Sequence, residues 1–144
     1  MPGCIFCQIA QGQSPASKVY EDEHTLAFMD LQQATEGHVL VIPKRHAESL
    51  FELDDETTAR LFQSVARVAR AVRASLQPSG LNLWQANGRA AGQSVFHVHV
   101  HILPRYEGDG LHIAVRERSG RASRAELDGL AARIRAAVGS DGHG

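Results

Sequence analysis

Three histidines alternate with aliphatic residues late in the chain. His97, His99 and His101 are each followed by a valine or an isoleucine, in the run HisValHisValHisIleLeu. A β-strand turns successive side chains to opposite faces, so this pattern predicts three imidazoles on one face and an apolar packing face behind them. Such a row of imidazoles could line a groove, chelate a metal ion or attack an electrophile.

The three chemistries make different demands on the histidine row. Two neighbouring imidazoles could hold one ion, but the first and third lie ~13 Å apart at ~3.3 Å per residue, too far to share it unless the chain bends. Attack on phosphorus needs a neutral ring. Histidine, with an ordinary pKa of ~6.5, is mostly neutral in the cytoplasm, and a hydrogen bond to one ring nitrogen leaves the other nitrogen free. The spacing therefore favours nucleophilic catalysis, with the groove and the metal site as alternatives.

Cys4 and Cys7 are the two cysteines of the chain and form a Cys-x-x-Cys pair. In a reducing compartment such a pair indicates redox or metal chemistry rather than a structural disulfide. A thioredoxin-like site would place the pair at the start of a helix that follows a strand, which residues 1–7 do not offer. A tetrahedral zinc site is the alternative, and two histidines could complete it.

The elements that must position these residues follow from hydrophobic period and turn signals. Short β-like runs predict strands at 17–21, 25–30, 38–43, 81–86 and 97–103. Asp54 caps a predicted helix over 55–76, and GlnProSerGly ends it. Ser123 and Glu126 form a capping box for a last helix that ends near Gly139. Strands in a run with inserted helices predict an α+β fold with an antiparallel sheet and two main helices.

The size and charge of the chain limit its organisation and its partners. Its 144 residues suit one domain, expected over 1–139, with a flexible tail at 140–144. The 15 Lys and Arg against 16 Asp and Glu form no basic block, which argues against a nucleic-acid polymer or a membrane as partner. The N-terminus lacks the features of a secretory signal, and no segment approaches the ~18 apolar residues of a membrane span. We therefore expect a cytoplasmic protein.

Several of these motifs together resemble the histidine triad (HIT) family of nucleotide hydrolases and transferases, and its bacterial cytoplasmic branch in particular. The resemblance covers about residues 4–110. It rests on the triad after GlyGlnSerVal, on CysIlePheCysGlnIle, LeuAlaPheMetAsp and GlyHisValLeuValIleProLysArgHis, and on LeuProArgTyrGluGlyAspGly after the triad. It implies a HIT-like five-stranded antiparallel sheet and a two-fold homodimer joined near residues Gln63 to Ala86.

The resemblance also implies catalytic roles for four residues. His99 takes the place of the nucleophile, His101 that of the residue bonded to the phosphoryl oxygens, and His38 that of a supporting histidine. Ser94 would serve the phosphate or the leaving group. A histidine that merely belongs to its strand is the alternative for His38.

The nucleotide-binding residues follow from the same resemblance. Asp30 would accept hydrogen bonds from the ribose hydroxyls, so that ribose is preferred over deoxyribose. Gln93 and backbone N–H groups of its loop would hold the phosphate. Asn87 would contact the phosphate or the scissile bridge, unless it only closes a turn with Gly88. The base would lie in an apolar slot, with plain core packing as the alternative. The slot residues are Ile5, Phe6, Ile9, Phe28 and Leu31.

Related bacterial members with the cysteine pair bind zinc through it, together with one histidine of the ProLysArgHis stretch and the first histidine of the triad. The matching ligands are Cys4, Cys7, His46 and His97. With His97 used for zinc, only His99 and His101 would face the substrate. This zinc would be structural, and catalysis would need no metal.

The function expected from all these features is hydrolysis of a purine nucleoside 5′-phosphoramidate or a dinucleoside polyphosphate. The α-phosphorus would be attacked to give a covalent nucleotidyl-His99, and an AMP-type purine nucleotide would be the ligand. Two alternatives remain. One is a non-catalytic nucleotide sensor or interaction module. The other is a metal-dependent hydrolase that uses the histidines as ligands.

Overall fold

The computed structural model describes residues 3–114 and 120–139, and the chain divides into two compact units, Met1–Leu111 and His112–Gly144. The first unit holds the strands and the candidate site. The second holds helix α3 (Arg124–Ala137). The single domain expected over 1–139 stays a prediction, and the expected tail at 140–144 lies outside the described residues.

The first unit is built on a five-stranded sheet with the strand order β1-β2-β3-β5-β4, in which every neighbouring pair is antiparallel. The predicted α+β fold is thereby confirmed. The strands are β1 (Lys18–Glu21), β2 (Thr25–Met29), β3 (Val39–Pro43), β4 (Gly80–Trp84) and β5 (Val100–Arg105). Between β3 and β5 the chain also forms two short 3-10 turns, Leu50–Glu52 and Arg89–Ala91.

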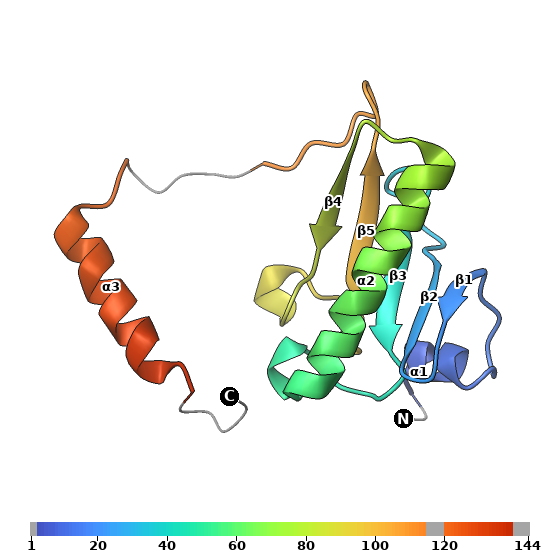
Figure 1. Ribbon diagram of the computed structural model, residues 1–144, viewed down its shortest axis with the longest axis horizontal. Helices are drawn as coiled ribbons and strands as arrows, with labels where there is room; N and C mark the ends of the chain where they lie inside the picture. The colour runs from blue at the N-terminus through green and yellow to red at the C-terminus, as the bar shows by residue number, and fades with distance from the viewer. Residues whose placement is uncertain (1–2, 115–119, 140–144) are drawn as a thin grey trace. The chain divides into compact units, whose positions relative to one another are not determined.

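Helix α2 (Asp55–Leu76) covers one face of the sheet (Figure 1). It begins as predicted, because the Asp54 carboxylate accepts the Thr57 N–H at 2.8 Å, and it ends at Gln77, which adopts a left-handed conformation before Pro78. One apolar stripe of the helix is buried against alternate residues of β2, β3 and β5. The packed residues include Leu61, Val65, Val68 and Val72 of the helix and Ala27, Val39, Val41, Val100 and Ile102 of the sheet.

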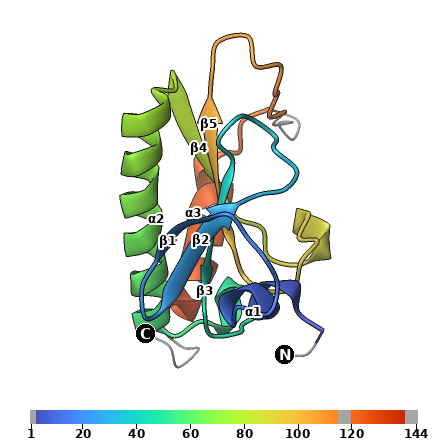
Figure 2. The same cartoon turned by 90° about the vertical axis from the view of Figure 1, so that its right-hand side faces the viewer.

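Helix α1 (Ile5–Ala10) lies on the opposite side of the sheet from α2 (Figure 2). Its Phe6 and Ile9 pack against the side chains of β2 and β3 that point away from α2. Those strand residues are Leu26, Phe28, Leu40 and Ile42. The sequence did not predict this helix, because six residues are too few to show a helical period. The side of the sheet that α1 covers carries the candidate site.

Strand β5 begins later than predicted, at Val100 rather than at position 97. Its pairing with β3 ends where Val100 faces Val41. The preceding segment bonds elsewhere, since the Val98 N–H donates to the Ala47 carbonyl at 2.8 Å. Only His101 of the three histidines therefore lies within a regular strand. Strand β4 likewise covers Gly80–Trp84 instead of 81–86.

Helix α3 begins at the predicted capping residue, because the Ser123 hydroxyl accepts the Glu126 N–H at 3.1 Å. Within the described ranges, no helix combines the length and the apolar character that a membrane crossing requires.

Candidate active site and metal centre

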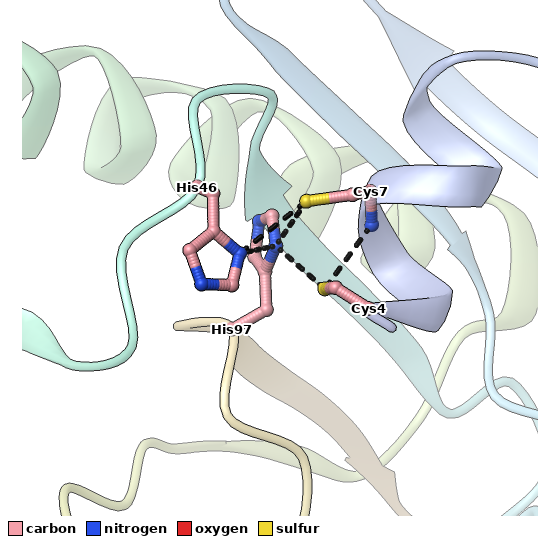
Figure 3. Close-up of side chains that lie close together, drawn as sticks. All are labelled: Cys4, Cys7, His46 and His97. Atoms are coloured by element: carbon pink, nitrogen blue, oxygen red, sulfur yellow. Dashed lines mark hydrogen bonds between the residues drawn. The ribbon is translucent and has the colours of Figure 1, made fainter. Parts of the chain in front are cut away.

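Two thiols and two imidazoles meet where α1 begins (Figure 3). The Cys4 Sγ lies 3.3 Å from His97 Nδ1, and the Cys7 Sγ lies 3.3 Å from His46 Nδ1 and 3.5 Å from His97 Nδ1. The two Nδ1 atoms are 3.3 Å apart. The structure thus brings together all four residues that the sequence and the resemblance nominated as zinc ligands.

These spacings fit the edges of a zinc tetrahedron. Bonds of ~2.0 Å to nitrogen and ~2.3 Å to sulfur give N–N edges of ~3.3 Å and N–S edges of ~3.5 Å. The His97 Nε2 lies 2.8 Å from the Pro43 carbonyl, which can only accept, so Nε2 carries the proton and Nδ1 presents its lone pair to the cluster. Burial lowers the pKa of His97 to about 4, which keeps this ring neutral as a ligand must be.

The cysteine pair opens helix α1, which the sequence did not predict. Cys4 is the N-cap, and its Sγ accepts the Cys7 N–H at 3.3 Å. Among the described residues no strand precedes this helix, so the strand-then-helix arrangement of a thioredoxin-like site is still missing. Burial, followed by the neighbouring Cys4 thiol, raises the pKa of Cys7. A bound divalent cation would oppose that effect by favouring the thiolates.

A cavity of about 330 Å³ opens beside this cluster. All five residues predicted for the base slot line it, and so do four of the predicted polar residues, Asp30, Ser94, His99 and His101. Three of the slot residues, Phe6, Ile9 and Phe28, are buried core side chains as well, whereas Leu31 is fully exposed at the rim. The cavity lining therefore combines apolar side chains with imidazoles, a hydroxyl and a carboxylate.

The tautomer of His99 is determined by a backbone carbonyl. The His99 Nδ1 lies 2.7 Å from the His97 carbonyl oxygen, so Nδ1 carries the proton and Nε2 keeps its lone pair. The ring stands edge-on to Phe6, with centroids 5.2 Å apart. Burial lowers the pKa of His99, and the neutral form is favoured. His99 thus presents a neutral, tautomerically defined imidazole at the cavity wall.

A second chain of hydrogen bonds defines the tautomers of His38 and His101. The Ala34 N–H donates to His38 Nδ1 at 3.2 Å, so His38 carries its proton on Nε2. That Nε2 lies 2.8 Å from His101 Nδ1 and donates to it. The proton of His101 is therefore on Nε2, where it can be donated to an anionic oxygen. Burial and the nearby His99 and His38 lower the pKa of His101 to about 4.

Asp30 lies at the end of β2, next to the histidines. Its Oδ1 accepts the Gln32 N–H at 2.8 Å, and its Oδ2 lies 3.5 Å from His38 Nε2. Burial lowers the pKa of His38, and the Asp30 carboxylate opposes that shift. Asp30, His38 and His101 are close enough to share a metal ion. His38 is a poor ligand in this arrangement, because its Nε2 carries the proton that its bond to Ala34 requires.

The structure does not bring Gln93 and Asn87 into the cavity. The Gln93 side chain accepts the Gly88 N–H at 2.7 Å and donates to the Glu48 carbonyl at 2.6 Å. The Asn87 Oδ1 accepts the Leu50 N–H at 2.8 Å. Both amides brace the loop, so their contact with phosphate stays a prediction that would first require breaking these bonds.

The predicted cradle of backbone N–H groups is also largely occupied. The Gly92 N–H donates to the Arg89 carbonyl at 2.9 Å, and the Gln93 N–H donates to the Gly88 carbonyl at 3.1 Å. These donors close the 3-10 turn and the loop around it. Of GlyGlnSer, only Ser94 lines the cavity.

Sequence reasoning missed the groups that define the imidazoles. The Pro43 and His97 carbonyls and the Ala34 amide are backbone atoms, and no residue pattern signals them. It also missed part of the cavity lining, namely Pro15, Ala16, Ser17, Met29, Gln32, Leu40 and Val95. Leu40 could have been found, because it precedes the buried Val41 and so faces the other side of β3.

A family model described as HIT domain matches residues 11–108. Protein hit of Bacillus subtilis (strain 168) is 56% identical over 108 residues, which cover 74% of this chain and 74% of that protein. Adenylylsulfatase HINT3 of Arabidopsis thaliana is 40% identical over 108 residues, which cover 75% of this chain and 55% of that protein.

Solved structures resemble the chain over nearly its whole length. A HIT family protein from Bacillus anthracis has a TM-score of 0.89 at 44% identity, covering 94% of this chain and 96% of that one. A Zn-bound histidine triad family protein from Mycobacterium smegmatis has a TM-score of 0.73 at 39% identity, covering 92% of this chain and 98% of that one.

Proposed function

This chain belongs to the HIT domain family, and from that membership we propose that it is a nucleotide hydrolase acting through a covalent nucleotidyl-His99. The observation that carries the proposal is the His99 tautomer. Its Nδ1–H donates to the His97 carbonyl, which leaves the Nε2 lone pair on a buried, neutral ring beside the cavity. A neutral imidazole with one free nitrogen is the form that attacks phosphorus.

The substrate is a purine nucleoside 5′-phosphoramidate or a dinucleoside polyphosphate. His99 Nε2 forms a bond to the α-phosphorus while the bond to the leaving group breaks, and a departing amine takes up one proton from solvent, which the second step returns. Water then adds to phosphorus, the N–P bond breaks, and the nucleoside monophosphate and a proton are released. The His101 Nε2–H stabilises the charge on the phosphoryl oxygens, and His38 holds His101 in that tautomer. Ser94, which also lines the cavity, would serve the phosphate or the leaving group.

The nucleoside half would be held by the apolar side chains of the cavity and by Asp30. A carboxylate accepts hydrogen bonds from two vicinal hydroxyls, so a ribonucleotide is preferred over its 2′-deoxy form. The cavity volume, about 330 Å³, falls within the range of small-molecule sites, ~300–1,000 Å³. The name of the Arabidopsis relative, adenylylsulfatase, supports an adenylyl group as the half that the protein holds.

Two other functions remain to be separated from this one. A nucleotide sensor would bind the same ligand without turnover. A metal-dependent hydrolase would need the histidines as ligands, and the proton on His38 Nε2 disfavours a metal at Asp30, His38 and His101.

Trapping the covalent adduct tests the proposal against both rivals. The protein is mixed with adenosine 5′-phosphoramidate labelled at phosphorus, quenched in base, and divided between acid and base. We expect protein-bound label that acid releases and base does not, as for a phosphoramidate bond to histidine. The His99→Gly variant should lose the label and at least about 10³-fold in kcat. His112→Gly, the same exchange at an exposed histidine outside the cavity, is the matched control. Turnover without an adduct would refute the mechanism.

Cys4, Cys7, His46 and His97 would hold a structural zinc ion, as the tetrahedral spacings allow. Its contribution would be to tie α1 to the segment before β5. The Zn-bound relative from Mycobacterium smegmatis supports a metal in this family. Catalysis as proposed uses none of these ligands as a reacting group. Two thiols kept as ligands also suit the cytoplasm, where we place the protein.

A homodimer joined through β4 and α2 is part of the proposal. The two edges of the sheet differ in character. Strand β1 exposes Val19 between the charged Lys18 and Glu21, whereas β4 exposes two large apolar side chains, Leu83 and Trp84. Exposed apolar side chains on an unpaired edge favour pairing with another strand. Phe62 and Leu76 of α2 are exposed as well. A second copy of the chain is the partner that this edge would take.

A further inference from the structure

The turn between β2 and β3 joins two residues of the candidate site, Asp30 at its start and His38 at its end. Its backbone makes few bonds of its own: the Asp30 N–H donates to the His38 carbonyl at 3.0 Å, and the His38 N–H to the Thr35 carbonyl at 3.2 Å. Most residues between them are exposed. An exposed turn with few internal bonds needs another source of order if its ends are to hold functional groups in place.

The side chain of Gln33 supplies that order. Its Nε2 donates to the Asp30 carbonyl at 2.5 Å and to the His38 carbonyl at 2.8 Å. Its Oε1 accepts the Gly37 N–H at 2.8 Å and the His38 N–H at 3.0 Å. The amide orientation is unambiguous, because one end faces two carbonyls and the other faces two N–H groups. One side chain thus binds both ends of the turn and uses its full hydrogen-bonding capacity.

Two features of the site depend on the conformation that Gln33 holds. Asp30, the first residue of the turn, lines the cavity, and its Oδ1 accepts the Gln32 N–H within the turn. Ala34, next to Gln33, donates its N–H to His38 Nδ1 and thereby determines the tautomers of His38 and His101. Gln33 itself is not among the residues that line the cavity.

We propose that Gln33 is a positioning residue, which holds the turn so that Asp30 meets the ribose hydroxyls and His38 keeps its tautomer. The ribose half of this statement rests on the proposed function. The tautomer half stands on the bonds within the turn. Gln33 acts through Asp30. Its removal should therefore change the ratio of the affinities for a ribonucleotide and its 2′-deoxy form, and not only the stability of the protein.

The donor and acceptor halves of the amide can be separated by substitution. Gln33→Glu keeps two acceptor oxygens for Gly37 and His38, but it removes the donor and places negative charge against two carbonyls. Gln33→Ala removes both halves. Glu36→Ala is the matched control in the same turn, because the bond that Glu36 receives from the Tyr106 hydroxyl is made to its backbone carbonyl, which the substitution keeps.

Two measurements test the inference. Calorimetry gives the dissociation constants for adenosine 5′-monophosphate and its 2′-deoxy form, whose ratio does not depend on the folded fraction. We expect the unmodified protein and Glu36→Ala to prefer the ribonucleotide by about tenfold or more, and both Gln33 variants to fall within about threefold of no preference. Amide hydrogen exchange by NMR should show faster exchange at Ala34 and His38 in the Gln33 variants alone.

The outcomes distinguish this inference from the proposed function. If the unmodified protein prefers the ribonucleotide and Gln33→Glu keeps that preference, the positioning role of Gln33 is overturned and the proposed function stands. If the unmodified protein shows no preference, the proposed ribose contact is overturned. In that case the exchange rates at Ala34 and His38 still test whether Gln33 holds the turn in which His38 keeps its tautomer. Unchanged rates in both Gln33 variants would overturn that role.

Discussion

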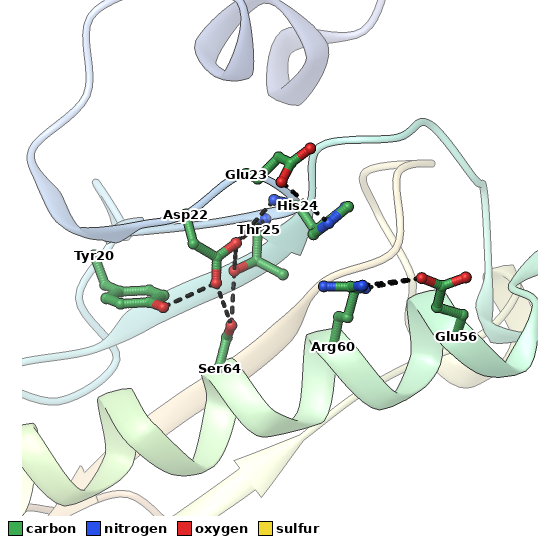
Figure 4. A network of polar contacts seen from close by, with 8 residues as sticks. All are labelled: Tyr20, Asp22, Glu23, His24, Thr25, Glu56, Arg60 and Ser64. Atoms are coloured by element: carbon green, nitrogen blue, oxygen red, sulfur yellow. Dashed lines mark hydrogen bonds and ion pairs between the residues drawn. The ribbon is translucent and has the colours of Figure 1, made fainter.

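Replacing Asp22 by alanine should lower the free energy of unfolding by about 3 kcal/mol, because this carboxylate joins the β1–β2 turn to helix α2 (Figure 4). Its Oδ1 accepts the N–H groups of His24 at 2.9 Å and Thr25 at 2.7 Å, and the Thr25 hydroxyl at 3.0 Å. Its Oδ2 accepts the hydroxyls of Tyr20 at 2.8 Å and of Ser64, on α2, at 3.3 Å. Thr25 and Ser64 are 1% and 2% exposed, so these groups have little access to water.

The magnitude follows from what each substitution leaves without a partner. Hydrogen bonds to a charged group contribute ~1.5–3 kcal/mol each, but five that share one carboxylate at a turn do not add. Asp22→Ala removes both carboxylate oxygens, so all five donors lose this acceptor, and the free energy of unfolding should fall by about 3 kcal/mol. Asp22→Asn keeps an oxygen for the two backbone N–H groups and should cost about 1 kcal/mol. The adjacent Glu23→Ala, at a side chain 88% exposed, should stay within about 0.5 kcal/mol.

The same network gives a pH dependence with a definite sign. Burial by itself would raise the pKa of Asp22, but the hydrogen bonds from His24, Tyr20 and Thr25 outweigh it and hold the pKa well below its usual range. A depressed folded-state pKa stabilises the protein above the unfolded value of ~3.9, and that stability is lost as the pH falls below it. Between pH 7 and pH 3 the unmodified protein should lose up to about 1 kcal/mol that Asp22→Asn does not lose. The other charged or titratable side chains around this network are Glu23, His24, Arg60 and Arg67.

Urea denaturation of the three variants and the unmodified protein, at pH 7 and pH 3, provides the assay. Loss of a bound metal in acid affects all the proteins alike, so differences between them isolate Asp22. The reasoning is refuted if Asp22→Ala costs no more than Glu23→Ala at an unchanged m-value. It is equally refuted if the gap between the unmodified protein and Asp22→Asn widens in acid.

Three further predictions concern the site, the metal and the edge strand. His38→Phe should lower kcat by about tenfold to a hundredfold and leave KM within about threefold, because His38 contacts His101 and not the substrate; steady-state kinetics in which only KM changes would contradict this. Removing metal with a chelator, or exchanging Cys7 for serine, should lower Tm markedly while turnover below the transition changes little; retained Tm with lost turnover would exclude a structural role. Leu83→Arg should shift the protein from dimer to monomer in sedimentation, whereas Lys18→Ala on the opposite edge should not.

Much of the fold could be predicted because its signals are local. Asp54, the helical period and the Pro78 stop gave the bounds of α2, and β-like runs between turn residues gave the sheet. The four candidate metal ligands and the cavity residues came from resemblance to a family, and the structure brings them together. Neither spacing nor residue type would have joined Cys4 to His97 across 93 positions of the chain.

The remaining features depend on backbone geometry that side-chain patterns do not encode. The alternation of histidine with aliphatic residues begins at position 97, before the β3–β5 pairing begins at Val100. This is why β5 was predicted to begin too early. The amides of Gln93 and Asn87 have the chemistry to bind phosphate, yet tertiary bonds to Glu48 and Leu50 use them within the loop. Gln33 gave no signal, since a glutamine in a polar turn is ordinary until its four partners are visible.

His97 belongs to both the candidate metal centre and the candidate active site. Its ring contacts the thiols, and its carbonyl accepts a hydrogen bond from the imidazole of His99. A substitution at position 4 or 7 therefore removes a contact of the same residue whose carbonyl bonds His99. A descendant of this chain that discarded its thiols would need another side chain to hold that ring. Without one, the segment that carries the carbonyl bonded to His99 would unfold at a lower temperature. Engineers who redesign the first seven residues face the same constraint.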